Sequence, residues 1–227
     1  MKKKLIVFAL CAISILTFSA CGSKKLDLND YIIEERTNLF TACDNMYTVT
    51  LSSGMRESDY NLDGVKNNMV EFSILTIMRN DGEPMANDNY TYVITVGEET
   101  LSGTLTKSQV DNSYSTDLEH IIPNDANINA EIKFTGYTFQ QDLTNTSADF
   151  SVDMATAISI ANDELNDDIR DILKDNAKIE VVTKILKDYS TEEVKRYYWY
   201  VGVISTNGDT LGILIDANSG EIIAKKV

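Results

Sequence analysis

Short runs of β-branched and aromatic residues recur along this chain, and they limit what it can fold into more than any other feature. The runs cover residues 46–51, 70–78, 90–96, 100–106 and 127–139. Such residues are enriched in strands, and several of the runs alternate with a period of two. The run at 70–78 is apolar on both faces, which predicts a central strand. A turn beginning at Gly97 separates two of the runs and predicts a hairpin.

Strands at hairpin spacing favour a β-sandwich, immunoglobulin-like or similar, over residues 30–149. Residues 31–43 fit either a first strand or a short helix, and we favour the strand. The polar stretch 140–149, rich in Thr and Asn, is interpreted as a linker that ends this domain. A helical pattern follows, so the expected fold class is α+β overall.

Residues 153–174 have the period of an amphipathic helix. Its apolar stripe comprises Met154, Ile158, Ala161, Leu165, Ile169 and Ile172. Ser151 or Asp153 can act as the N-cap. Four strand-like runs follow, at 179–189, 197–205, 211–215 and 221–225, and Asn207 with Gly208 predicts a hairpin turn. We expect Trp199 and its strand face to pack under the helix, and residues 151–227 to fold alone.

This last segment resembles the PepSY domain. The resemblance rests on the Ala-rich helix from Met154, the aromatic strand 198–203, and the closing motif Asp-Ala-Asn-Ser-Gly-Glu-Ile at 216–222, in which Ser219 replaces the usual Thr. It implies a small extracytoplasmic domain, residues 150–227, with one helix packed on an antiparallel sheet. The family is often proposed to bind or inhibit peptidases, which the resemblance extends to this chain.

The N-terminus predicts the compartment. Lys2 to Lys4 precede an apolar run, residues 5–18, that is shorter than the ~20 residues needed to span a bilayer. The following Phe18-Ser19-Ala20-Cys21 resembles the lipobox of bacterial lipoproteins. The leader indicates a signal peptide over 1–20, and the resemblance implies acyl chains on Cys21 and cleavage before it, at the extracytoplasmic face of the cell membrane. The polar residues that follow suit a tether over 21–29. The alternative is an ordinary secretory peptide cleaved near Ala20.

Charge and cysteine usage exclude other classes. The chain has 20 Lys and Arg against 35 Asp and Glu, a formal charge of −15, which argues against a nucleic-acid partner. Cys11 lies in the leader and Cys21 is the expected lipid attachment site. Cys43 then has no intramolecular partner, and we interpret it as a small buried hydrophobic residue rather than a reactive thiol.

Residues 59–64 contain the first half of a calcium loop. Asp59, Asn61 and Asp63 occupy alternate positions before Gly64, and alternating oxygen ligands suit Ca²⁺. The twelfth position is Val70 instead of Glu. A polar turn between strands predicts the same residues. We therefore expect no metal and no cofactor, with Asp59, Asn61 and Asp63 as a weak calcium candidate.

No motif predicts catalysis. His120 is the only His and no nucleophile elbow accompanies it. Residues 197–200 are rich in Tyr and could offer a stacking surface to a glycan or peptide, although we favour packing in and around the core as the explanation. The sequence favours a membrane-anchored, non-catalytic module that binds an envelope protein or peptide, including modulation of an envelope peptidase. The alternatives are a carboxylate-dependent hydrolase and a structural or sensory accessory with a weak calcium site.

Overall fold

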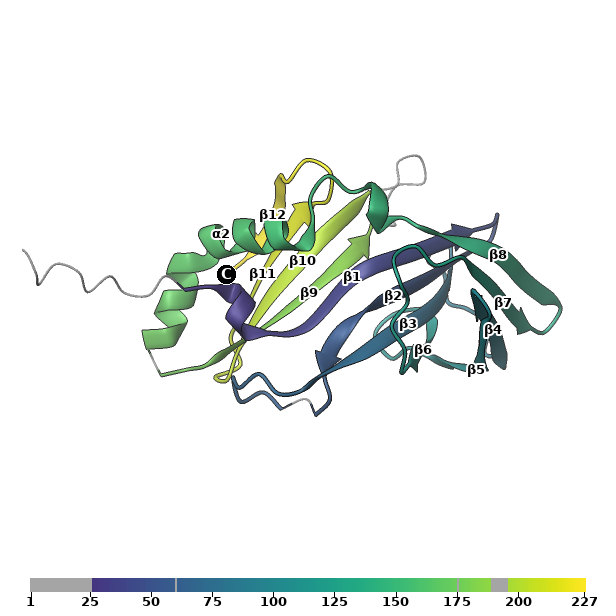
Figure 1. Cartoon of the computed structure of the whole chain (residues 1–227), viewed down its shortest axis with the longest axis horizontal. Coiled ribbons are helices and arrows are strands. Elements are labelled where there is room, and N and C mark those ends of the chain that lie inside the picture. The colour runs from purple at the N-terminus through teal and green to yellow at the C-terminus, as the bar shows by residue number, and fades with distance from the viewer. Residues whose placement is uncertain (1–25, 60, 175, 189–195) are drawn as a thin grey trace, which may run out of the picture.

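A computed structural model describes residues 26–59, 61–174, 176–188 and 196–227. The predicted signal peptide and Cys21 therefore lie outside the described residues. Within the described chain, twelve strands form one sheet, and a single long helix lies across one end of it (Figure 1). No helix in these ranges combines the length and apolar character that crossing a bilayer requires.

The element bounds place most strands where the sequence predicts them. The first eight strands are β1 (Ile32–Cys43), β2 (Tyr47–Glu57), β3 (Met69–Arg79), β4 (Tyr90–Val96), β5 (Glu99–Lys107), β6 (Tyr114–Leu118), β7 (Ile128–Phe134) and β8 (Tyr137–Asn145). The remaining elements are η1 (Leu28–Tyr31), η2 (Ser147–Asp149), α2 (Met154–Lys174), β9 (Ile179–Lys187), β10 (Tyr197–Ser205), β11 (Thr210–Asp216) and β12 (Ile222–Lys226). The short strand β6 has no counterpart in the sequence prediction.

The first eight strands close into a barrel, so the predicted β-sandwich is wrong. Their order is β1-β2-β3-β6-β5-β4-β7-β8, and β8 returns to β1 through the pairs Phe40–Asn145 and Thr41–Thr144. The stretch 140–149, predicted as a linker, is largely the second half of β8. Alternating burial is the same in a sandwich and in a barrel, and only the long-range pairing of β1 with β8 distinguishes them.

The interior of the barrel is filled with apolar side chains. Its core includes Phe40, Val49, Leu51, Leu75, Ile77, Tyr90, Ile94, Ile128, Ile132 and Phe139, each at most 2% exposed. Alternate residues of each strand point inward, which is the period-two pattern that the sequence contains. The barrel is therefore held together by packing.

A second core lies between α2 and the strands β9 to β11. Ile158, Ala161, Leu165 and Ile169 of the helix are fully buried against Trp199, Val201 and Val203, among others. These contacts confirm the predicted helix stripe and the predicted packing face of β10. Asp153 is the N-cap, because its side chain accepts a hydrogen bond from the Thr156 amide at 2.8 Å.

The predicted PepSY-like arrangement after a sandwich is nevertheless wrong, because this helix and meander share a sheet with the barrel. β9 pairs in parallel with β1, with Ile32 opposite Val181. Leu28, Ile32 and Leu39 from the start of the described chain belong to the core under α2. The N-terminal segment therefore completes a core whose other members come from residues 152–217.

Strand β1 connects the two cores. Its first half contributes Ile32 to the core under α2 and pairs with β9, whereas its second half contributes Phe40 to the barrel core and pairs with β8. The change of partner lies between Arg36 and Phe40. A register shift toward β2 occurs there, between Arg36 and Asn38, and another toward β9 occurs earlier, between Ile32 and Glu34. Figure 1 shows β1 running from beneath the helix into the barrel.

Candidate functional site

The face of the sheet opposite α2 carries an unusual row of side chains. Cross-strand register places Lys184 of β9 between Arg36 of β1 and Tyr200 of β10. On the far side of Arg36, Gly54 of β2 and Phe72 of β3 continue the row. Residues paired in register point to the same face. We call this surface the helix-free face.

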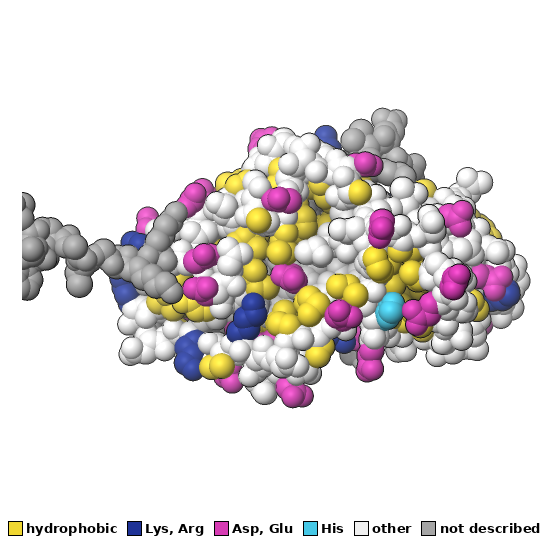
Figure 2. All heavy atoms as spheres, in the orientation of Figure 1, with side chains coloured by type: hydrophobic (Ala, Val, Ile, Leu, Met, Phe, Trp, Pro, Cys, Tyr) yellow, Lys and Arg dark blue, Asp and Glu magenta, His cyan; other side chains and the backbone are white. Residues whose placement is uncertain are grey.

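The positive charges on and beside this row differ in whether a carboxylate pairs with them. Arg36 forms an ion pair with Glu34, with Nη2 2.7 Å from Oε1. Arg56, in the neighbouring row, pairs with Asp117 at 3.1 Å. Lys184 has neither a hydrogen bond nor an ion pair to its ammonium within the described residues, and its nearest partner is the Tyr200 ring at 5.5 Å. Figure 2 shows acidic side chains spread over the helix side of the molecule.

Lys184 is half-buried, and its environment is unfavourable for its charge. Burial lowers the pKa of the ammonium below its usual value, the nearby Arg36 lowers it further, and Glu34 acts in the opposite direction. Like charges directly opposite each other on neighbouring strands also destabilise a sheet. Lys184 is therefore a cation that the ligand-free fold leaves poorly stabilised.

Aromatic rings form the floor of this face. Phe72 is 1% exposed, and the Arg56 and Arg36 guanidiniums lie 4.5 and 5.7 Å from its ring centre. Tyr200 crosses Gly202 so closely that a methyl group there would lie 2.6 Å from the tyrosine hydroxyl oxygen. The glycine lets the ring lie against the sheet.

A pocket of about 470 Å³ opens beside this row. Its lining residues are Ile33, Glu34, Arg56, Glu57, Ser58 and Val182. Ile33 and Val182 supply apolar walls, and volumes of this size are typical of sites for small ligands or side chains. Val182 is two residues before Lys184 on β9 and shares its face, so the pocket adjoins the uncompensated ammonium.

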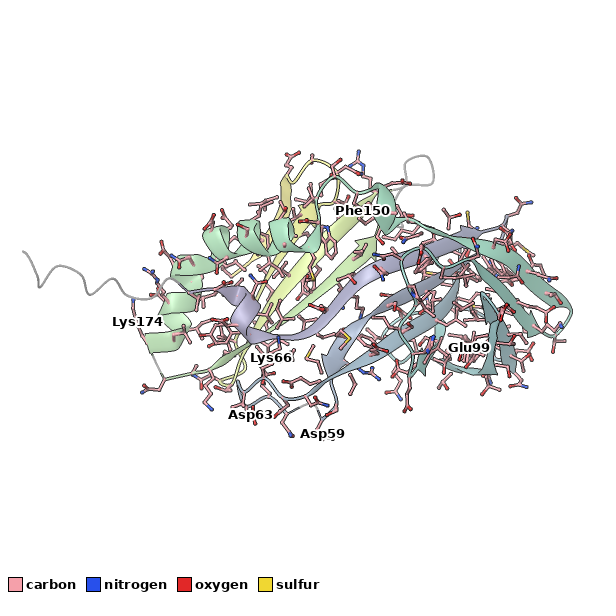
Figure 3. The ribbon with its side chains drawn as sticks, viewed as in Figure 1. Asp59, Asp63, Lys66, Glu99, Phe150 and Lys174 are labelled. Carbon is pink, nitrogen blue, oxygen red and sulfur yellow. The ribbon has the colours of Figure 1, made fainter. Side chains whose placement is uncertain are left out.

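The loop that contains the calcium candidates is held by a carboxylate. Oε1 of Glu180, a side chain only 1% exposed, accepts hydrogen bonds from the amides of Asp63 and Gly64 at 2.9 and 2.8 Å. Asp63 itself accepts from the Val65 amide at 2.8 Å, which is an Asx turn. Figure 3 shows Asp59 and Asp63 in this loop at the lower edge of the molecule.

Glu57 anchors the other end of the same loop. Its Oε1 accepts from the Asn67 amide at 2.5 Å, and the side chain is 5% exposed. The described residues contain no group of three or more His, Cys, Asp or Glu side chains placed to hold a metal ion. Two buried carboxylates that accept hydrogen bonds from backbone N–H groups thus explain the geometry of the loop. The calcium candidate stays a prediction.

Substitution of Gly64 by Ala is expected to destabilise the protein more than the same change at Gly82. Both glycines have positive φ, 65° and 72°, where an L-residue costs about 1–2 kcal/mol. A Cβ at Gly64 would also lie 2.2 Å from Cβ of Lys178, whereas nothing lies within 4 Å at Gly82. Urea denaturation of both variants measures the difference, and equal losses would contradict this packing of the loop on Lys178.

The other sequence candidates do not converge on one place. His120 lies 3.6 Å from the exposed Glu99, and no second catalytic group accompanies it among the described residues. Cys43 is exposed, so its interpretation as a buried hydrophobic residue is wrong, because it ends β1 at the rim of the barrel. Trp199 is buried in the core under α2 and is not available for stacking.

A second hollow, of about 370 Å³, lies where α2 begins. Phe150, labelled in Figure 3, is one of its walls, together with Thr37 and Asn38 of β1. Asp153 is the one charged residue that lines it, and its carboxylate caps the helix. The helix-free face is the better candidate, because the Lys184 ammonium has no ion pair among the described residues, whereas the Asp153 carboxylate is already bound to the helix N-terminus.

Sequence reasoning missed the residues of the helix-free face. Arg36, Arg56 and Lys184 each look like an ordinary polar position in an alternating strand. Glu180 and Lys184 occur at even positions of the strand-like run 179–186, which was a local signal that β9 has a polar second face. The pairing register of β1, β2 and β9 brings the three cations together. This register cannot be read from a local sequence pattern.

Comparisons with protein-family models, with curated proteins and with solved structures found no match.

Proposed function

We propose that this protein is a lipid-anchored, extracytoplasmic binding protein without catalytic activity of its own, and that the helix-free face is where it binds a protein or peptide. The observation that carries the proposal is the half-buried ammonium of Lys184, which has no acceptor among the described residues and adjoins a pocket with apolar walls. Perturbed charged groups beside a pocket are typical of functional sites.

The anchoring part of the proposal is supported by the leader. A basic start, a short apolar run and the sequence Phe18-Ser19-Ala20-Cys21 suit export followed by acylation of the cysteine. Two or more acyl chains hold a protein stably at a bilayer, whereas one chain does so marginally.

The more specific suggestion of peptidase modulation has lost its support. It came from the resemblance to the PepSY domain, whose expected arrangement after a separate sandwich is contradicted by the shared sheet. The hydrolase alternative also lacks a specific observation in its favour: of the two carboxylates lining the pocket, Glu34 pairs with Arg36 and Glu57 accepts from Asn67.

Replacing Cys21 by Ser tests the proposed anchoring. We expect the variant to lose all incorporation of labelled acyl chains and to leave the washed membrane fraction, because the thiol is the attachment atom. Cys43→Ser is the matched control, since it removes an exposed thiol and should leave the protein in the membrane fraction. Labelled lipid in the Cys21→Ser protein would overturn the proposed anchor.

A further inference from the structure

We propose that the helix-free face binds an acidic, extended peptide segment, with an apolar side chain in the pocket beside Val182 and a carboxylate two residues further on against Lys184. This inference rests on the proposed function and names its ligand class. It is carried by three observations on this face: an uncompensated cation, an adjoining apolar pocket, and the spacing between them.

The ammonium of Lys184 is a position where a ligand anion would be stabilised. Arg36 and Lys184 are direct cross-strand partners, an arrangement that costs stability unless their charge is neutralised. Glu34 forms its ion pair with Arg36 at 2.7 Å and acts on Lys184 only from a greater distance, and no carboxylate forms an ion pair with Lys184 among the described residues. A ligand carboxylate placed there gains a charge-assisted hydrogen bond in a partly desolvated setting, where such bonds are strongest.

The pocket requires more than a simple anion. Its apolar walls are Ile33, which is 2% exposed, and Val182. Three charged side chains also line it, Glu34, Glu57 and Arg56. Arg56 is paired with Asp117 and Glu34 with Arg36, so the pocket offers no unpaired cation to a carboxylate and favours an uncharged side chain. The carboxylate and the apolar group of the ligand therefore occupy neighbouring positions on the face.

The spacing of the two positions fits an extended peptide. Val182 and Lys184 are two residues apart on β9 and point to the same face. Side chains two residues apart on an extended strand are separated by about 6.6–6.8 Å. A peptide that runs along β9 in extended conformation presents its side chains i and i+2 at the same interval, whereas a free phosphate or acetate ion reaches only one of the two positions.

Binding is tested with purified full-length protein in uncharged detergent and blocked pentapeptides, titrated by nuclear magnetic resonance. The probe is Gly-Leu-Gly-Glu-Gly, with Gly-Leu-Gly-Gln-Gly as its neutral counterpart and Gly-Leu-Glu-Gly-Gly as the version with altered spacing. We expect the first peptide to bind at least about tenfold more tightly than either of the others, since a hydrogen bond to a charged group contributes that much or more. Equal affinities, or no binding of any of the three, would overturn the proposal.

Two lysine variants locate the carboxylate. Lys184→Gln should abolish the preference for the glutamate peptide, whereas Lys174→Gln removes the same charge from α2 (Figure 3) and should leave it intact. Val182→Gln removes an apolar wall and should weaken binding several-fold while the preference for glutamate remains, which keeps the test decisive if Lys184→Gln fails to fold. Equal effects of both lysine variants contradict the proposed contact.

Sodium acetate separates a peptide ligand from a simple anion. We expect acetate to compete with the glutamate peptide only at much higher concentration. If acetate competes at the same concentration as the peptide, the ligand is a small anion, and the proposed ligand class is overturned. The titration does not depend on acylation, so a failure of the Cys21 test would leave its result unchanged, and the two proposals can fail separately.

Discussion

A fragment of residues 151–227 is expected to show no cooperative thermal transition in isolation. It contains α2 and β9 to β12, but it lacks Leu28, Ile32 and Leu39, which are at most 5% exposed in the core under α2. Burying one such side chain contributes about 1.5–3 kcal/mol, so the fragment loses about 5–9 kcal/mol. Whole domains are stable by only ~5–15 kcal/mol.

The fragment also exposes backbone groups that the full chain satisfies. The edge of β9 that pairs with β1 is left open, and open edges promote aggregation. Circular dichroism during heating checks the prediction, with residues 26–227 as the control that retains β1. A cooperative transition of the fragment alone would show that residues 150–227 are an independent domain, as the sequence predicts.

Replacing Trp199 by Ala is expected to destabilise the full chain by about 3–5 kcal/mol. The indole is 2% exposed, and its Nε1–H donates to the Val152 carbonyl at 2.8 Å. The substitution leaves a cavity between α2 and β10 and an unpaired carbonyl at the entry to the helix.

Urea denaturation measures this loss, and Tyr200→Phe is a control on the same strand. Tyr200 points to the opposite face, and its replacement by Phe leaves the core under α2 unchanged. We expect a change of less than about 1 kcal/mol from the loss of a part-exposed hydroxyl. Similar losses for both variants would contradict the burial of one face of β10 under the helix.

Elements with a strong local period could be predicted from the sequence. The stripe from Ile158 to Ile169 indicated α2, and the runs 90–96 and 100–106 with the turn between them indicated the β4–β5 hairpin. Closure of the barrel could not be predicted, because it depends on Phe40 pairing with Asn145. The continuation of the sheet into β9 depends on an equally distant pair, Ile32 with Val181.

The site was less predictable than the fold for the same reason. The spacing of Asp59, Asn61 and Asp63 is a local pattern, and it drew attention to a loop whose backbone is held by Glu180 from another part of the chain. No local pattern links Arg36 with Lys184, and only the parallel register of β1 and β9 makes them neighbours.

The double role of β1 also affects the order in which the chain can fold while it is synthesised. β1 is among the first segments to emerge, and β2 can pair with one of its edges at once. Its other edge waits for β8 and then for β9. Until the C-terminal third has emerged, Leu28 and Ile32 stay exposed together with an open strand edge, and such partly folded chains are prone to associate with one another. Dilution or a chaperone at the exit site should therefore raise the yield of folded protein more than any change in the barrel interior.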